Sequence, residues 1–158
     1  MSRELITSWA DYRAAADRVL ALATRTLRIY DEDLAQFHLE RPERLALIEE
    51  LLAAGRPDCL RIALRDATPL KRHQPLTIGL LVRFSHFAAA QQTPTQLSHL
   101  RDSMLIVDER HAVIRFDRDQ PRSKLLIDEV DEVAPYLRRF GEIWAEGGEP
   151  VSATTLGL

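Results

Sequence analysis

Cysteine and glycine are both scarce in this sequence. The single cysteine, Cys59, excludes an intramolecular disulfide and a thiolate metal cluster. It lies in an apolar run, residues 59–64, where we expect a buried small hydrophobic side chain. The six glycines form neither GxGxxG nor GxxxxGK, so the phosphate-binding loops of the usual nucleotide folds are excluded.

Long apolar runs are missing as well. No stretch approaches the ~18 consecutive apolar residues of a membrane span, and residues 1–13 carry charges where a secretory signal needs an apolar segment. We therefore expect a cytoplasmic protein without a membrane span. The formal net charge of -3 argues against a general nucleic-acid coat, so nucleic acid is not an expected partner.

The composition is that of an ordinary globular protein. Hydrophobic residues make up 46% of the sequence and charged residues 28%. A chain of 158 residues fits one domain, which buries roughly 70% of the surface that the unfolded chain exposes. Because no repeat, linker or charge block divides the chain, we predict a single domain over residues 1–147 and a C-terminal tail over residues 148–158.

Helix and strand patterns alternate through the first half of the chain. Apolar residues recur at helical spacing over residues 9–24, and a short β-rich segment follows at residues 26–30. A second helical pattern occupies residues 42–55, and residues 59–64 form the next strand. The order strand, helix, strand predicts a right-handed crossover and a parallel pair. We expect an α/β fold whose mixed, largely parallel sheet is flanked by helices.

The second half of the chain gives weaker signals. Residues 65–74 are typical of a polar, irregular loop, and residues 75–85 of a helix. Residues 101–116 indicate two strands joined by a tight turn. The remaining predicted elements are a weak strand at 86–92, a short strand at 124–127 and an amphipathic helix at 128–148.

Two pairs of side chains in these elements have simple structural interpretations. His111 and Arg115 alternate along a predicted strand, and we expect them on its outward face. We expect Trp9 and Trp144 to pack in a core or an interface rather than to form a stacking platform.

Polar side chains that suit an anion come from two predicted strand regions. Those that follow the strand at 59–64 are Arg65, Lys71, Arg72 and His73, and those of the later strand are Arg101, Ser103 and Asp108. Arginine and lysine together suit a phosphate or a carboxylate, which the guanidinium group can bind through two hydrogen bonds. The alternative is that these residues are solvated loop charges and that Asp108 caps a turn.

The order of elements, the loop RDATPLKRHQP and the strand pair MLIVDERHAVIRF resemble one half of a phospholipase D-like domain. The resemblance covers roughly residues 15–146. In that superfamily a strand carries His, then Lys two residues on and Asp five further, and the His attacks phosphorus to form a phosphohistidine. Since single-half members pair to bring two such sites together, the resemblance implies a homodimer. The sequence is also similar to a small uncharacterised bacterial family with this fold, found alone or joined to an acetyltransferase domain.

The catalytic pair of the superfamily motif is replaced in this sequence. If Asp108 is the motif's Asp, Arg101 occupies the His position and Ser103 the Lys position. Arginine has a pKa above about 12 and cannot act as a nucleophile at neutral pH. None of the five histidines reproduces the spacing, and residues 115–126 lack the small-residue stretch with Asn that follows the motif in active members.

Other chemistries have little support. No His-x-x-x-His spacing is present, so we expect neither a metal site nor a cofactor. A Ser-His-Asp set could combine Ser103 and Asp108 with His99 or His111, but the sequence has no nucleophile elbow. We expect a non-catalytic phospholipase D-like module that binds an anionic group or a protein partner. The alternative is a metal-independent phosphodiesterase or nuclease that uses His99 or His111. A third possibility is nucleic-acid binding without hydrolysis.

Overall fold

Eight strands form one mixed sheet in the computed structural model, which describes residues 1–151. Their order across the sheet is β1-β7-β6-β5-β2-β3-β4-β8. The pairs β2/β3 and β3/β4 are parallel, and the other five neighbouring pairs are antiparallel. The strands are β1 (Ser2–Ile6), β2 (Leu27–Asp31), β3 (Leu60–Leu64), β4 (Ala88–Gln92), β5 (Ser103–Val107), β6 (His111–Arg115), β7 (Ser123–Ile127) and β8 (Glu149–Pro150).

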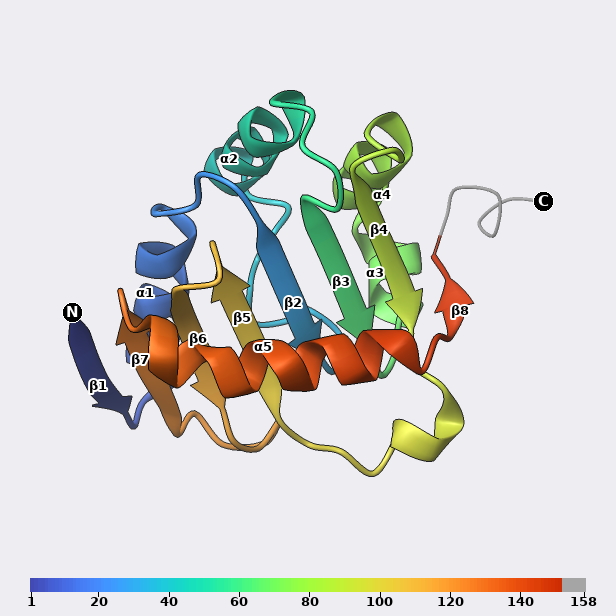
Figure 1. Ribbon diagram of the computed structural model, residues 1–158. Helices are drawn as coiled ribbons and strands as arrows, with labels where there is room; N and C mark the ends of the chain where they lie inside the picture. Colours follow the sequence, from blue (N-terminus) through green and yellow to red (C-terminus); the bar gives the residue numbers. More distant parts are fainter. Residues whose placement is uncertain (152–158) are drawn as a thin grey trace.

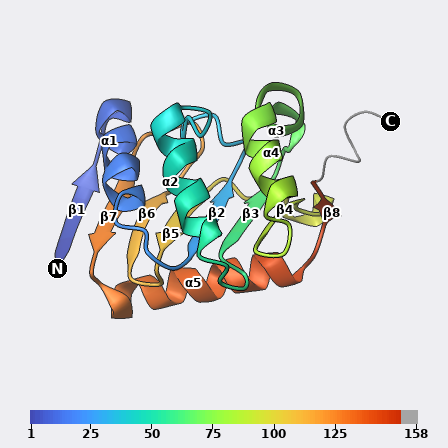
Figure 2. The same ribbon diagram turned by 90° about the horizontal axis from the view of Figure 1, so that it is seen from above.

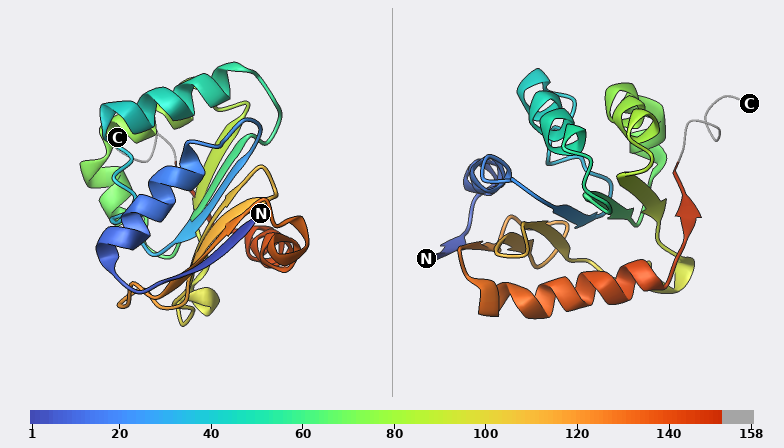
Figure 3. Two further views of the ribbon diagram at one scale, coloured as in Figure 1. Left: turned by 90° about the vertical axis from the view of Figure 1, so that its left-hand side faces the viewer. Right: turned by 45° about the horizontal axis from the view of Figure 1, so that its top comes forward.

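Helices cover both faces of this sheet. The helices are α1 (Trp9–Leu20), α2 (Pro42–Ala53), α3 (Thr68–His73), α4 (Pro75–Arg83) and α5 (Val130–Ala145), with a 3-10 turn at Thr95–Leu97. The first four helices lie on one face, and α5 crosses the other face alone (Figures 1, 2 and 3). The expected α/β fold with a mixed sheet flanked by helices is confirmed (Figure 2). The expectation that the sheet is largely parallel is wrong, because only β2, β3 and β4 pair in parallel.

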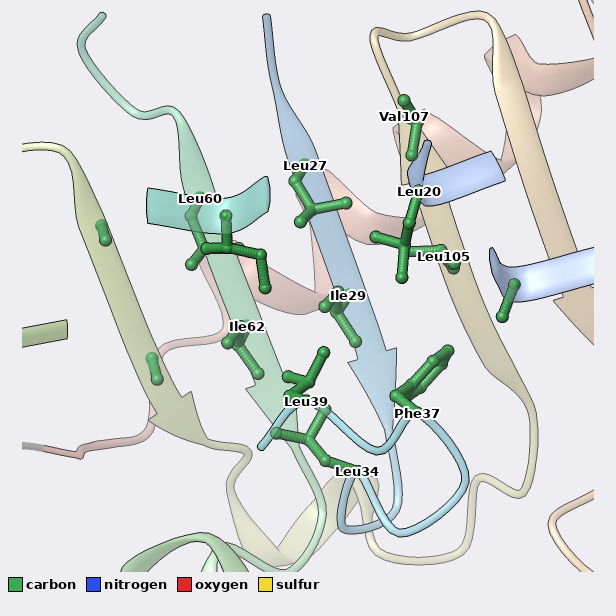
Figure 4. Packing of buried hydrophobic residues seen from close by; sticks show 14 of the residues in the cluster. Leu20, Leu27, Ile29, Leu34, Phe37, Leu39, Leu60, Ile62, Leu105 and Val107 are labelled. Atoms are coloured by element: carbon green, nitrogen blue, oxygen red, sulfur yellow. The ribbon is translucent and has the colours of Figure 1, made fainter. Parts of the chain in front are cut away.

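The alternation of side chains along each strand divides the core into two layers. Leu27 and Ile29 of β2 belong to the larger hydrophobic cluster, which packs under α1, α2 and α4 (Figure 4). Tyr30 belongs to the smaller cluster, which packs under α5. Because helices cover both faces of the sheet, strand residues that point to either face are buried.

The ends of the strands line two opposite borders of the sheet, and we call these borders its edges; the outermost strands are β1 and β8. We call one the carboxyl-terminal edge: β2, β3 and β4 end there at Asp31, Leu64 and Gln92, and β5 begins there at Ser103. At the opposite edge β2 and β3 begin, and β5 turns into β6. In Figure 1 the arrowheads of β2, β3 and β4 mark the carboxyl-terminal edge. Loops at the carboxyl ends of parallel strands are the usual ligand sites of open α/β sheets.

The sequence analysis missed β1, α3 and β8. β1 has the sequence SRELI and lacks the apolar run of an inner strand, because it is an outermost strand and pairs only with β7. α3 lies inside residues 65–74, which we expected to be irregular. Pro69 is tolerated there because it falls in the first turn of the helix.

The expectation that His111 and Arg115 face outward is wrong, since both are buried. β6 lies between β5 and β7 and has α1 on one side and α5 on the other. Trp9 and Trp144 are partly buried and pack against the two core clusters, as expected.

The ordered chain continues beyond residue 147. Glu149 and Pro150 pair with β4, and the backbone N–H of Val151 donates to the carbonyl of Ala90 at 2.9 Å. Residues 149–151 therefore do not belong to a loose tail. The rest of the predicted tail, residues 152–158, lies outside the described residues.

Gly148 is required where the chain enters β8. Its φ is +144°, and a Cβ added there would lie 1.9 Å from the carbonyl oxygen of Gln92. We expect Gly148→Ala to detach β8, to lower the free energy of unfolding by about 1 kcal/mol, and to remove hydrogen-exchange protection at the Val151 amide. Gly141→Ala is the control, because nothing lies within 4 Å of that position in α5. Unchanged protection at Val151 in the Gly148 variant would contradict this role.

Candidate functional site

A buried polar network joins three strands at the carboxyl-terminal edge. Asp31, Ser103 and Arg115 are 1%, 1% and 2% exposed, so solvent does not reach them. The Arg115 guanidinium donates to Asp31 Oδ1 at 3.0 Å and to Ser103 Oγ at 3.2 Å. The Ser103 hydroxyl donates to the same Asp31 oxygen. Ser103, which occupies the motif's Lys position, is therefore hydrogen-bonded to both other members of the buried network.

Further contacts from α1 and from the loop after β6 hold the Arg115 guanidinium group in place. Its guanidinium carbon lies 5.2 Å from the ring centroid of Trp9 and 5.0 Å from that of Tyr12. Its second terminal nitrogen donates to the carbonyls of Asp117 and Arg118 at 3.2 and 2.8 Å. Burial raises the pKa of Tyr12 to about 12, and the neighbouring charge of Asp31 adds to that rise. The ring is therefore a neutral support for the guanidinium group.

Arg65 lies at the same edge and is also paired within the protein. Its Nε donates to Glu32 Oε1 at 2.9 Å, and its Nη1 donates to the carbonyl of Asp102 at 2.8 Å. Burial would raise the pKa of Glu32, but its bonds with Arg65 and Arg118 outweigh burial and lower it. The Arg65 side chain is 1% exposed, so its charge is neutralised below the surface.

Arg101 occupies the motif's His position at the surface, just before β5. Its Nε donates to Asp117 Oδ2 at 2.7 Å, and its Nη2 bonds to both Asp117 and Asp119. These ion pairs lower the pKa of Asp117 to about 2. Because the guanidinium group is shared between two carboxylates, it is occupied by the protein's own loop.

The basic residues of α3 have a different environment. Lys71, Arg72 and His73 form the last turn of this helix, and Arg72 and His73 are exposed. Within residues 1–151, none of the three takes part in an ion pair. They remain open to a ligand in solution.

Asp108 lies at the opposite edge, away from the other six candidates. Its carboxylate accepts the backbone N–H groups of Thr24, Arg25 and Thr26 at 3.0, 2.7 and 3.0 Å, and the hydroxyl of Thr24 at 2.8 Å. Its φ of 55° belongs to the tight turn between β5 and β6. The seven sequence candidates therefore do not form one cluster, and Asp108 holds the segment that enters β2.

The pKa of Asp108 gives a test of this structural role. Burial would raise the pKa, but the bonds from residues 24–26 outweigh it and lower the pKa. A depressed folded-state pKa means that the stability contribution is present above the unfolded pKa of about 3.9 and is lost as the pH falls through the folded value. We expect Asp108→Asn to cost about 1–2 kcal/mol at pH 7 and distinctly less at pH 3 in urea unfolding. An equal cost at both pH values would contradict this assignment.

The two alternative histidines lie at different edges. His99 is exposed in the connection between β4 and β5, at the carboxyl-terminal edge. His111 is buried at the start of β6, where its Nδ1 accepts the backbone N–H of Asp128 at 2.9 Å. Burial lowers the pKa of His111, in keeping with an Nδ1 that accepts a hydrogen bond. No grouping of three His, Cys, Asp or Glu side chains within residues 1–151 could hold a metal ion.

The sequence analysis missed the acidic partners at this edge. Asp31 ends β2 and Glu32 follows it, and their carboxylates neutralise Arg115, Arg65 and Arg118. The available signal was the acidic turn DED at residues 31–33, which closes the first predicted strand. Asp31 and Arg115 are 84 positions apart, so no local sequence pattern indicates that they pair.

None of the helices described in residues 1–151 combines the length and the apolar character that crossing a membrane requires.

Solved structures with similar folds include TrmBL2, an archaeal chromatin protein whose structure shows a novel mode of DNA binding. TrmBL2 has 16% sequence identity and a TM-score of 0.69, and the match covers 94% of this chain and 54% of TrmBL2. This chain thus spans about half of the TrmBL2 chain.

Two phospholipase D-like structures match over nearly their whole length. Nuc from Salmonella typhimurium, a phospholipase D family member, has 12% identity and a TM-score of 0.63, with 96% of this chain and 99% of Nuc covered. NucT from Helicobacter pylori has 11% identity and a TM-score of 0.57, with 96% of this chain and 98% of NucT covered. At such identities the likeness concerns the fold, and the phospholipase D-like fold is confirmed.

No curated protein matches the sequence significantly. One family model, described as a domain of unknown function, DUF7931, matches residues 8–153. This match covers most of the chain, and the protein therefore belongs to the DUF7931 family.

Proposed function

We propose that this protein is a non-catalytic phospholipase D-like module that binds an anionic group. The observation that supports this proposal most directly is the buried network of Asp31, Ser103 and Arg115. It occupies the strand position where the superfamily motif places its lysine. A side chain that is 1% exposed and hydrogen-bonded on both sides cannot reach a substrate phosphate.

The position of the motif's nucleophile supports the same conclusion. Arg101 cannot form a covalent bond to phosphorus because the guanidinium group stays protonated. The carboxylates of Asp117 and Asp119 also keep the Arg101 guanidinium group from contacting an incoming phosphodiester. Binding by such a module would use basic groups that the protein does not neutralise, such as those of α3.

The experiment is a hydrolysis assay of the purified chain in metal-free buffer. Bis-p-nitrophenyl phosphate and single-stranded DNA are the substrates, and an active phospholipase D-like nuclease is the positive control. We expect no turnover above the buffer rate. Turnover that is lost in His99→Ala or in His111→Ala would overturn the proposal and support the phosphodiesterase or nuclease alternative.

The structural likeness to TrmBL2 favours a second candidate, DNA binding without hydrolysis. The net charge of -3 opposes it, because phosphate contacts dominate the affinity of DNA-binding proteins. Fluorescence anisotropy with labelled duplex DNA at low and at moderate salt tests this candidate. Saturable binding that weakens steeply with salt would support it, and no binding at low salt would remove it.

We also propose that the chain forms a homodimer, as the superfamily resemblance implies. Light scattering coupled to size-exclusion chromatography should give a mass twice the 18.0 kDa of one chain. The doubled mass should persist on dilution if the interface is of standard size. A mass of one chain at every concentration would contradict the dimer.

A further inference from the structure

The basic side chains near the carboxyl-terminal edge include two groups that differ in their pairing. Arg65, Arg101, Arg115 and Arg118 are each paired with a carboxylate of the same edge. A second group, on the side of α1 to α3, takes part in no ion pair among the described residues; its members are Arg13, His38, Arg41, Lys71, Arg72 and His73. Unpaired cations that are held close together favour an anion.

Three members of the second group belong to, or contact, the loop that joins β2 to α2, residues 32–41. His38 belongs to this loop, and the backbone N–H of Arg41 donates to the His38 carbonyl at 3.2 Å. Arg13 of α1 donates to Gln36 Oε1 at 3.3 Å. The Arg13 guanidinium group is thus attached to the segment that carries His38, and Arg41 ends that segment at the N-cap of α2.

The loop is held rigidly by its own side chains. Leu34, Phe37 and Leu39 are each 1% exposed and point toward the strands of the larger core (Figure 4). Asp31 Oδ2 accepts the backbone N–H of Leu34 at 2.8 Å, and Arg44 donates to the Phe37 carbonyl at 2.6 Å. A loop anchored in this way presents His38 in a fixed position.

The loop's far end is anchored as well. The Glu40 carboxylate accepts the backbone N–H groups of Leu76 and Thr77 in α4 at 3.1 and 2.8 Å, and the Thr77 hydroxyl at 2.6 Å. The acid next to Arg41 in sequence is therefore used to cap α4.

His38 is exposed between two buried neighbours. Its φ of 50° lies in the left-handed region, where histidine is enriched among non-glycine residues. Burial lowers the pKa of His38 first, and the charges of Arg41 and Arg13 lower it further. The charged groups that act on this imidazole are thus both cations, and a bound anion would relieve their repulsion.

We propose that Arg13, His38 and Arg41 bind a phosphate group. This inference rests on the proposed function and names the ligand chemistry and the site for it. Two guanidinium groups and an imidazole offer donors to the terminal oxygens of a phosphate monoester, and the amide nitrogen of Gln36 adds one more. A carboxylate would leave part of this donor set unused.

The test follows the backbone and imidazole NMR signals of the intact chain while inorganic phosphate is added at low ionic strength. We expect saturable shifts at Arg13 and at residues 36–41, with a Kd on the order of 1 mM. Arg13→Gln and Arg41→Gln should each weaken binding at least tenfold. Arg138→Gln, on the exposed side of α5, is the matched control and should bind like the natural chain. All of these positions are at least partly exposed, and the dispersion of the spectra checks that each variant is folded.

Further titrations distinguish the source of the phosphate. Tighter binding of glycerol phosphate than of a single-stranded oligonucleotide would assign the site to a small phosphorylated molecule. The reverse order, with competition by inorganic phosphate, would assign it to a nucleic-acid backbone. Shifts that do not saturate, or that persist unchanged in both arginine variants, would overturn the site. The hydrolysis assay is independent, so a failed phosphate titration leaves the non-catalytic assignment standing, and turnover would leave the phosphate site standing.

Discussion

Replacing Asp31 with alanine should lower the free energy of unfolding by about 3–5 kcal/mol. The substitution leaves the buried guanidinium group of Arg115 without its carboxylate, and it removes the acceptor of the Ser103 hydroxyl. It also removes the acceptor of two backbone N–H groups, those of Asp33 and Leu34. Urea unfolding at pH 7 measures the loss.

The matched controls separate the ion pair from the rest of the network. Ser103→Ala removes one hydroxyl and should cost about 1 kcal/mol. The double variant Asp31→Ala with Arg115→Met removes both charges, and it should cost much less than the sum of the two single variants. Additive costs, or a cost of the Asp31 variant below that of the Ser103 variant, would show that the pair does not act as a unit.

Replacing Phe37 with alanine should lower the free energy of unfolding by about 3–5 kcal/mol as well. The side chain is 1% exposed and its ring lies 6.3 Å from that of Tyr12, so its removal leaves a cavity under the loop that joins β2 to α2. Since His38 follows it directly, the same substitution should abolish phosphate binding. Urea unfolding and the phosphate titration measure the two effects.

Phe37→Leu is the control for this second substitution. It keeps most of the apolar volume and should cost less than about 1.5 kcal/mol while retaining phosphate binding. If Phe37→Ala cost no more than Phe37→Leu, the loop would not be anchored by this side chain. If Phe37→Leu also lost phosphate binding, the loss of binding in Phe37→Ala could not be explained by its lower free energy of unfolding alone.

The fold was largely predictable because its central strands carry a clear local signal. The segments at 26–30 and 59–64 are β-rich, and the helical pattern between them led directly to the parallel pair of β2 and β3. β1 gave no such signal, because an edge strand with one neighbour can carry charges. The outward placement of Arg115 failed because alternation alone does not show that helices cover both faces of the sheet.

The candidate site was less predictable, since its decisive contacts are long-range. The sequence identified Arg101 and Ser103 as replacements in the motif, but not the residues that pair with them. Asp31 and Arg115 are 84 positions apart, and they meet only because β2, β5 and β6 are adjacent in the sheet. Asp108 keeps its expected position in the turn between strands, where it binds three backbone N–H groups at the edge away from Arg65.

The most direct test of the non-catalytic assignment is a search for a covalent phosphorylated form of the protein. The chain is incubated with an oligonucleotide substrate, quenched under conditions that preserve phosphohistidine, and analysed by intact mass and peptide mapping. The structure predicts an unmodified protein, because the motif's nucleophile is replaced by the ion-paired Arg101 and its lysine by the buried Ser103. A phosphohistidine mapped to His99 or His111 would contradict it.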